Sequence, residues 1–211
     1  LNLKVNISKP ERVFMIAIIN YGVGNLKSIL KAIEFVGEKA VITDNTKDLL
    51  NADAIVFPGV GAFKTAIQKL RSMKDVVDSL SVPILGICLG MQLFATRSTE
   101  GGIYDGLNYI PGEVVKLPEY AGKIPHIGWN TISFCKYSEI LDGIEEGSYV
   151  YFVHSYYLKT DKKFVTTETE YGIKFTSGVE KDNYYGFQFH PEKSGEVGLK
   201  IIENFIKIAK R

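Results

Sequence analysis

The sequence predicts an α/β fold with an open, largely parallel central sheet, helices on both faces of that sheet, and an antiparallel, strand-rich C-terminal half. Two observations carry this prediction. In the first hundred residues, short apolar runs alternate with segments whose apolar residues recur at helical spacing, which is typical of βαβ units with parallel strands. After residue 100, strand-like segments follow one another through short turns, which favours antiparallel pairing.

Four short apolar runs in the N-terminal half predict strands that are buried on both faces. They are residues 15–19, 40–43, 54–57 and 83–87. The segments that follow them predict amphipathic helices, because apolar side chains repeat every three or four positions. These helices are expected at residues 26–36, 63–70, 76–80 and 88–95. A glycine-rich turn at residues 21–25 precedes the first helix, and Gly37 suits the C-terminus of that helix.

The C-terminal half is expected to consist of six strands and a final helix. The strands are predicted at residues 114–117, 131–134, 149–158, 164–169, 172–179 and 184–189. The helix runs to the end of the chain, and Ser194 or Gly195 is expected to cap its start. No repeat or linker divides the sequence, so residues 15–211 are predicted to form one domain. Residues 1–14 match no element and are predicted to be an N-terminal extension of unknown status.

The composition is that of an ordinary globular protein and excludes several kinds of partner. The 211 residues include 25 lysines and arginines against 24 aspartates and glutamates, so the formal net charge is +1. A balance this even argues against nucleic acid or an anionic membrane as the main partner. No apolar run approaches the roughly 20 residues of a membrane helix, and the N-terminus lacks the apolar core of a signal peptide. Two cysteines make no disulfide framework, so a reducing cytoplasm is the expected location.

The segment 86–90 places a cysteine between two glycines at a predicted strand-to-helix turn. This G-x-C-x-G spacing is the cysteine version of the hydrolase nucleophile elbow. The glycines permit a sharp turn, and the N-terminus of the following helix favours the thiolate of Cys88. The N–H group of Leu89 would then face a developing oxyanion. Cys135 has no such surroundings and is predicted to be a packing residue.

One of the three histidines has an acid at a suitable spacing. Pro191 favours an extended backbone at His190, so Glu192 projects to the same side as the imidazole and can orient it. Together with the elbow, this gives a nucleophile, a base and an orienting group for acyl transfer. His154 has no acid two residues away and is predicted to be structural or to line the site. His126 is expected on a loop, and the scattered histidines predict no metal site.

A second glycine-rich turn, residues 58–61, closes the third predicted strand. The carboxyl ends of strands in an open parallel sheet border the ligand crevice. Backbone N–H groups of this turn are therefore candidates to meet an anion or an oxyanion, although on its own the pattern is better explained by a simple tight turn. The other glycine-rich turn, residues 21–25, departs from G-x-G-x-x-G, so a dinucleotide site is not expected.

Four segments taken together resemble the class I (triad) glutamine amidotransferases. They are residues 58–61, 86–92, 154–156 and 190–192, in the expected order along the chain. The resemblance implies that Cys88 attacks the side-chain amide of L-glutamine, that His190 transfers protons and that Glu192 holds His190. It also implies an oxyanion hole made by the N–H groups of Val60 and Leu89, and no cofactor. The glutamine-binding positions that it implies are Gly59, Gly61, Gln92, Glu100, Ser155 and Tyr156.

Three segments, residues 21–26, 125–130 and 190–195, resemble one branch of this family. In that branch the glutaminase docks on a (β/α)8 barrel cyclase subunit, through which it delivers ammonia in histidine biosynthesis. The resemblance implies a heterodimer with such a barrel, with Asn25, Trp129 and Lys193 at the interface. An exposed loop tryptophan is a typical interface anchor, although core packing is the alternative for Trp129.

Three other functions stay open on the sequence. The chain could supply ammonia to another synthase, such as anthranilate synthase. It could be a different cysteine hydrolase, such as a peptidase on a related fold. A catalytically silent subunit that only regulates a partner is the third alternative, and the intact Cys88, His190 and Glu192 argue against it.

Overall fold

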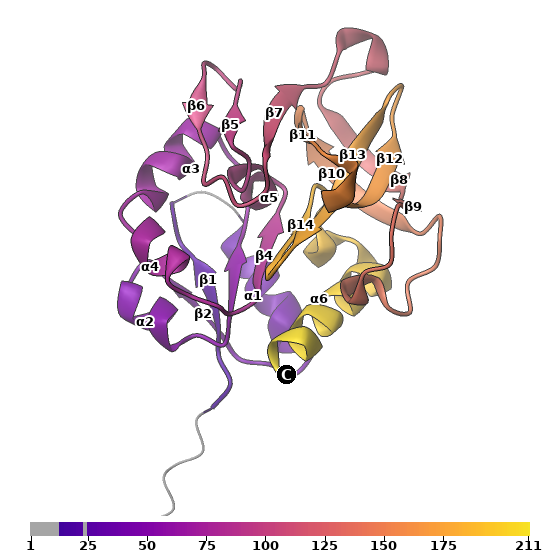
Figure 1. Ribbon diagram of the computed structural model, residues 1–211. Coiled ribbons are helices and arrows are strands. Elements are labelled where there is room, and N and C mark those ends of the chain that lie inside the picture. Colours follow the sequence, from indigo (N-terminus) through magenta and orange to yellow (C-terminus); the bar gives the residue numbers. More distant parts are fainter. Residues whose placement is uncertain (1–12, 23–24) are drawn as a thin grey trace, which may run out of the picture.

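The computed structural model describes residues 13–22 and 25–211 (Figure 1). Residues 1–12 of the predicted extension and residues 23–24 of the first glycine-rich turn lie outside the described residues. The boundary between an extension at 1–14 and a domain at 15–211 stays a prediction. None of the described helices is long and apolar enough to cross a membrane.

The largest sheet among the described residues has eight strands, in the order β2-β1-β3-β4-β14-β13-β12-β9. In chain order these strands are β1 (Ile16–Ile19), β2 (Ala40–Thr43), β3 (Ala54–Phe57), β4 (Ile84–Ile87), β9 (Ser133–Phe134), β12 (Val165–Glu170), β13 (Lys174–Lys181) and β14 (Tyr184–Phe187). Pairing is parallel from β2 to β14 and antiparallel from β14 to β9. The predicted combination of a largely parallel sheet and an antiparallel C-terminal half is confirmed.

Helices cover both faces of this sheet, as predicted. They are α1 (Leu26–Phe35), α2 (Thr46–Asn51), α3 (Phe63–Leu70), α4 (Lys74–Asp78), α5 (Leu89–Leu93) and α6 (Gly195–Ala209). Figure 1 shows α2, α3 and α4 together along one side of the sheet. Successive side chains of β1 point to opposite faces: Ala17 and Ile19 pack in the cluster that includes α3 and α4, whereas Ile16 and Ile18 pack in the cluster with α1 and α6.

Two smaller sheets stand beside the main one. In the first, β8 (His126–Thr131) pairs antiparallel with β10 (Tyr149–His154). The second has the order β11-β7-β5-β6 and consists of β5 (Arg97–Ser98), β6 (Tyr104–Asp105), β7 (Gly112–Lys116) and β11 (Tyr156–Thr160). Short 3-10 helices complete the fold: η1 (Glu119–Ala121), η2 (Glu139–Leu141), η3 (Lys162–Phe164) and η4 (Pro191–Lys193).

The structure corrects several predicted elements. The predicted strand 149–158 is wrong as a single strand, because Ser155 divides it into β10 and β11, which belong to different sheets. The predicted strand 131–134 is likewise shared between β8 and β9. Helix α2 was not predicted, since Leu49 is its one buried side chain and leaves no helical pattern to detect.

The predicted cap position of the last helix is confirmed, but without the expected side-chain hydrogen bond. Ser194 is the N-cap residue of α6, but its side chain makes no capping hydrogen bond. Its hydroxyl donates instead to the carbonyl of His190 at 2.7 Å and accepts from the N–H of Tyr151 at 3.0 Å. Ser194 therefore ties the start of α6 to β10 and to the segment that carries His190.

Candidate active site

Cys88 sits at a sharp turn between β4 and α5. Its backbone has φ +50° and ψ −105°, a left-handed conformation that costs a non-glycine residue free energy. The flanking glycines make the turn possible by close approach: a Cβ on Gly90 would lie 1.9 Å from the carbonyl oxygen of Phe57, and one on Gly86 would lie 2.7 Å from the ring of Phe94. The strand-to-helix elbow expected for residues 86–90 is present.

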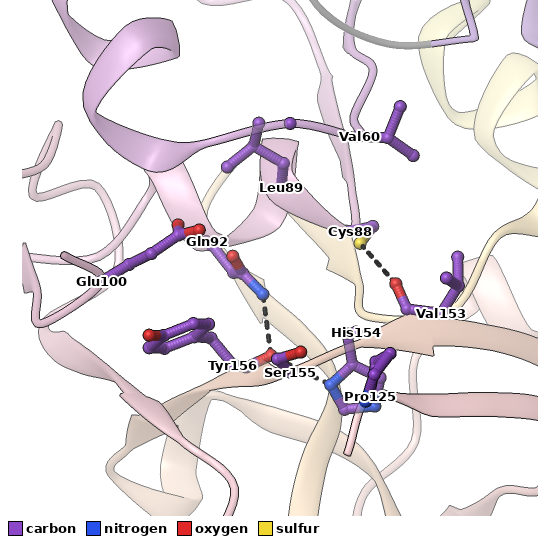
Figure 2. Close-up of a pocket in the computed structure, with 11 residues that line it drawn as sticks. Val60, Cys88, Leu89, Gln92, Glu100, Pro125, Val153, His154, Ser155 and Tyr156 are labelled. Carbon is purple, nitrogen blue, oxygen red and sulfur yellow. Dashed lines mark hydrogen bonds between the residues drawn. The ribbon is translucent and has the colours of Figure 1, made fainter.

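The sulfur of Cys88 is buried but faces a cavity. Cys88 as a whole is only 6% exposed. The Cys88 thiol is placed to donate to the carbonyl oxygen of Val153 at 3.8 Å (Figure 2). The same sulfur accepts a hydrogen bond from Nε2 of Gln188 at 3.4 Å. The nucleophile predicted from the sequence therefore has both a donor and an acceptor in contact with it.

His190 follows β14, the strand that pairs in parallel with β4. Its N–H donates to the carbonyl oxygen of Tyr151 at 2.9 Å, and its Nδ1 lies 2.9 Å from Oε1 of Glu192. The two side chains are 2% and 5% exposed. The adjacency of β4 and β14 brings Cys88 beside His190, so the structure assembles the three residues that the sequence singled out.

Electrostatic interactions decide the protonation of His190. Burial by itself lowers the pKa of this imidazole. The nearby Cys88 sulfur and the Glu192 carboxylate favour the charged ring more strongly, and together they raise the pKa of His190 to about 10. A protonated His190 beside a thiolate can act as a general acid toward a leaving group, and the thiolate can act as a nucleophile.

A cavity of about 300 Å³ opens beside Cys88 (Figure 2). It is lined by Val60, Gly61, Cys88, Leu89, Gln92, Glu100, Pro125, Val153, His154, Ser155 and Tyr156. Both predicted oxyanion-hole residues and all but one of the predicted glutamine-binding residues are therefore among its walls. Gly59 is the exception. It packs against the elbow instead, since a Cβ on Gly59 would lie 2.6 Å from the carbonyl oxygen of Ile87.

Two polar side chains of the cavity are held by backbone groups. Gln92 donates from Nε2 to the carbonyl oxygen of Tyr156 at 2.9 Å. Oε2 of Glu100 accepts from the N–H of Phe63 at 3.0 Å, at the first turn of α3, where a negative charge is favoured. The cavity thus combines an amide and a carboxylate at fixed places.

The remaining two histidines form a buried pair. The prediction that His126 lies on a loop is wrong: it is the first residue of β8 and is paired in register with His154 of β10. Nδ1 of His126 lies 3.0 Å from Nε2 of His154. Burial lowers the pKa of His126 to about 4 and that of His154 to about 3, so both rings are neutral at pH 7. His154 lines the cavity, which is one of the two roles predicted for it.

The predicted interface residues are exposed. Trp129 is 55% exposed and lies on β8 rather than on a loop, so it is not a core residue. Its ring meets that of Tyr151 at 6.0 Å, and Nζ of Lys193 lies 5.8 Å from the centre of the same tyrosine ring. Asn25 is exposed at the start of α1, the helix that packs against η4.

Two further observations concern residues that could bind metal or react. Within 13–22 and 25–211, the structure contains no group of three or more His, Cys, Asp or Glu side chains arranged to hold a metal ion. Cys135 was predicted to be a packing residue, and this is wrong, because it is exposed next to the short edge strand β9.

Sequence reasoning missed three contributors to the site: Pro125, Val153 and Gln188. The first two line the cavity through loop and strand geometry that leaves no motif. Gln188 had a signal. It lies two residues before His190 in an extended segment, so the alternation that relates His190 to Glu192 also relates Gln188 to His190.

Comparison with known proteins decides the family. Residues 17–209 match the family described as Glutamine amidotransferase class-I. The chain belongs to this family. It is 65% identical over 197 residues to "Imidazole glycerol phosphate synthase subunit HisH" of Archaeoglobus fulgidus, covering 93% of this chain and all of that protein. The protein of the same name from Methanocaldococcus jannaschii is 46% identical over 197 residues. The match covers 92% of this chain and all of that protein. Within the family, the chain is thus a member of the HisH group.

Solved structures agree on the fold. The chain superposes on a putative GMP synthase protein from Thermoplasma acidophilum with a TM-score of 0.74, 23% identity and 94% coverage of both chains. It superposes on a structure described as PurLQS from Thermotoga maritima with a TM-score of 0.72, 16% identity, and coverage of 92% of this chain and 98% of that chain. At these identities, the likeness concerns the fold alone.

Proposed function

We propose that this chain hydrolyses L-glutamine with a triad of Cys88, His190 and Glu192 and passes the ammonia to a synthase partner. The observation that carries the proposal is the geometry at the elbow. A cysteine held in a left-handed turn lies beside an imidazole whose other nitrogen is 2.9 Å from a buried carboxylate. Membership of the class I glutamine amidotransferases supplies the substrate.

In the first half-reaction, the Cys88 thiolate attacks the side-chain carbonyl carbon of glutamine, and the carbonyl π electrons move onto oxygen. The backbone N–H groups of Val60 and Leu89 receive the resulting oxyanion. His190, as the imidazolium, donates a proton from Nε2 to the amide nitrogen. The C–N bond then breaks, ammonia leaves, and a thioester remains on Cys88.

In the second half-reaction, the neutral His190 takes a proton from water, and the hydroxide attacks the thioester carbonyl. The C–S bond breaks, glutamate is released, and the thiolate–imidazolium pair is restored. Glu192 keeps Nδ1 protonated and directed at itself, which leaves Nε2 for both proton transfers. No cofactor enters either step.

The cavity accounts for how glutamine would be held. Glu100 offers a carboxylate for the α-amino group of the substrate, and Gln92, Ser155 and Tyr156 offer hydrogen bonds along the cavity wall. Gly61 has φ +133°, which favours glycine, and it lines the cavity. We assign Gly59 an indirect role, since it packs against the elbow and leaves no room there for a side chain.

The chain is a glutaminase subunit of imidazole glycerol phosphate synthase, in line with the names of its HisH relatives. The partner that we expect is a (β/α)8 barrel cyclase of the HisF type, which receives the ammonia. The outward side chains of β8 and β10 support a docking site there: Ile127, Trp129 and Tyr149 are all more than half exposed. Asn25 and Lys193 are the polar residues that we expect beside them.

Ammonia would be wasted if glutamine were hydrolysed before an acceptor is bound. We therefore expect low glutaminase activity in the isolated chain and a rise when the partner binds its acceptor. The peptide between Gly59 and Val60 is the candidate switch, because rotation of this peptide turns the Val60 N–H toward or away from the oxyanion.

Replacement of the nucleophile tests the function. In the complex with the barrel cyclase, Cys88→Ser should abolish glutamine-dependent synthesis and leave synthesis from added ammonium salt intact, since only the ammonia source is lost. Cys135→Ser is the matched control, because that cysteine is exposed and outside the site; it should leave both activities unchanged. Glutamine-dependent synthesis that survives Cys88→Ser would contradict the proposal.

A further inference from the structure

Gln188 is a buried amide that the triad mechanism does not use. Gln188 is fully buried, and its backbone N–H donates to the backbone carbonyl oxygen of Ser177 at 2.9 Å. Nε2 of Gln188 lies 3.4 Å from the sulfur of Cys88, and its Oε1 lies 3.1 Å from Nε2 of Gln92. It is not among the residues that line the cavity, so it contacts the nucleophile from behind rather than the substrate.

Neighbouring groups dictate which end of the Gln188 amide faces the sulfur. The carbonyl oxygen of Tyr156 can only accept hydrogen bonds. It lies 2.9 Å from the side-chain nitrogen of Gln92, which must therefore be a donor. The same nitrogen lies 3.1 Å from Gln188, so Gln188 must present its oxygen there. The remaining end of Gln188, which meets the sulfur, is the N–H donor.

The histidine pair reinforces this arrangement. Nδ1 of His154 lies 2.9 Å from the same Tyr156 carbonyl oxygen and must donate to it, which leaves Nε2 of His154 as an acceptor for Nδ1–H of His126. Nε2 of His126 is then an acceptor too, and Nδ2 of Asn130 lies 3.4 Å from it. The hydrogen bonds of Asn130, His126, His154, Gln92 and Gln188 are thus consistent with one assignment of donors and acceptors.

We propose that Gln188 is a positioning residue for the nucleophile, whose side-chain N–H stabilises the Cys88 thiolate and holds its sulfur toward the cavity. This inference rests on the proposed function, in which Cys88 is the nucleophile. The protonated thiol donates to the carbonyl oxygen of Val153, whereas the thiolate can only accept, and Gln188 is the donor that meets it. A hydrogen bond to the charged form of a group favours that form.

Other ionisable groups around the sulfur must be separated from this effect. The Cys88 charge contributes to the raised pKa of His190, and Glu192 contacts His190 through Nδ1. Tyr21, at the end of β1, is buried, and the Cys88 charge contributes to the raised pKa of its hydroxyl. His154 lines the same cavity. A substitution at Gln188 replaces none of these ionisable groups, although it also removes the acceptor of Gln92. Alkylation of Cys88 without glutamine does not depend on substrate binding by Gln92.

The test measures the reactivity of Cys88 in the full chain, without glutamine. Gln188→Met keeps the length of the side chain and removes the donor. Alkylation of Cys88 by iodoacetamide is followed by peptide mass spectrometry to separate it from Cys135. Its pH profile should move to higher pH by about one unit or more, so that the rate below the midpoint falls about 10-fold or more. In the complex, kcat for glutamine should fall about 10-fold or more while KM stays close to its original value.

Asn204→Leu is the matched control. Asn204 is also a buried amide, but it donates to the carbonyl oxygens of Ile140 and Asp142, and none of these residues lines the cavity. This variant should lose stability and keep the alkylation profile of Cys88. A folded Gln188→Met chain with an unchanged profile would overturn the proposal. The profile requires no turnover of glutamine, so a failure of the proposed function would appear separately, as an alkylation effect without any glutaminase activity.

A measurement on the unsubstituted chain covers the case in which Gln188→Met does not fold. The sequence contains three glutamines, Gln68, Gln92 and Gln188, so selective 15N-glutamine labelling gives three side-chain amide signals. The Gln188 signal should shift over the pH range in which Cys88 reactivity titrates, and this shift should vanish in Cys88→Ser. Gln68 is exposed on α3 and serves as the internal control. If no buried amide signal follows the titration, the proposal is wrong.

Discussion

Cys88 occupies a backbone conformation that is unfavourable for its own side chain, and its neighbours leave it no other. The left-handed φ of +50° points the sulfur away from the sheet and into the cavity. Gly90 lies against Phe57 and Gly86 lies against Phe94, so β3 and α5 meet the elbow at distances that exclude any side chain. The strain at one residue is therefore sustained by packing at two others.

Substitution of Gly90 by alanine tests this packing. Gly90 lies in α5, where alanine would otherwise be favoured by about 1 kcal/mol. Its Cβ would overlap the carbonyl oxygen of Phe57 at 1.9 Å, so we expect Gly90→Ala to lower the free energy of unfolding by about 3 kcal/mol or more in urea titrations. Gly147→Ala is the control. It has φ +81° but open space around it, so about 1 kcal/mol is expected. Equal losses would show that overlap at the elbow is unimportant.

At this scale, the sequence predicts a residue's place well where a short motif combines with strand alternation. Cys88, His190 and Glu192 lie together as expected, because the elbow fixes one of them and an extended backbone fixes the other two. The predictions for His126 and Cys135 were wrong because no such motif fixes either residue. Each follows a loop whose path depends on distant partners: β10 buries His126, and β9 leaves Cys135 on an exposed edge.

The two-stranded sheet of β8 and β10 presents two different faces. On its inner face, the His126–His154 pair packs among aromatic rings, with His126 stacked on Tyr171 at 4.0 Å and on Phe152 at 4.9 Å. On its outer face, Trp129 and Tyr151 are in contact. Alternation along each strand places the neutral histidines on the inner face, where His154 lines the cavity, and Trp129 and Tyr151 on the outer face. This element therefore lies between the catalytic site and the proposed partner.

The buried histidine pair predicts a fall in stability on acidification. Burial holds the pKa of His126 and of His154 at about 4 and about 3, below the value of about 6.5 in an unfolded chain. Between about pH 6.5 and pH 4, the unfolded chain therefore binds more protons, so the stability present above pH 6.5 is lost as the pH falls. His126→Phe should make the slope of unfolding free energy against pH shallower by about 1.4 kcal/mol per pH unit in that window. Superimposable slopes for the two chains would contradict this assignment.

Elements with their own local pattern were predictable, and those defined by partners were not. The strands β1, β3 and β4 are continuous apolar runs with all positions buried, and each was predicted within one residue of its bounds. The run that forms β10 and β11 looks continuous, yet it changes sheets at Ser155, whose carbonyl oxygen accepts from the N–H of Leu117. The break depends on the partner strands, because β10 pairs with β8 and β11 pairs with β7.

In the molecule as a whole, the candidate catalytic residues lie on one side of the main sheet, at the carboxyl ends of its central strands. The elbow follows β4, His190 follows β14, and the turn at 58–61 follows β3, three neighbouring strands in the sheet order. Because these strands are parallel, their carboxyl ends meet, and the cavity forms where they end. The carbonyl of Val153 links this side of the sheet to β10, whose outer face carries the exposed aromatic residues.

Association with the partner is expected to depend on that outer face. Trp129 is 55% exposed and its ring packs edge-to-face against that of Tyr151, which Lys193 also covers. An exposed tryptophan is the kind of side chain that dominates an interface. Trp129→Ala should weaken binding to the barrel cyclase about 30-fold or more in calorimetric titrations, which corresponds to about 2 kcal/mol. Tyr137→Ala is the control, since Tyr137 is 77% exposed outside β8 and β10, and its affinity should stay unchanged. If Trp129→Ala binds as tightly as the original chain, Trp129 is not an anchor of the interface.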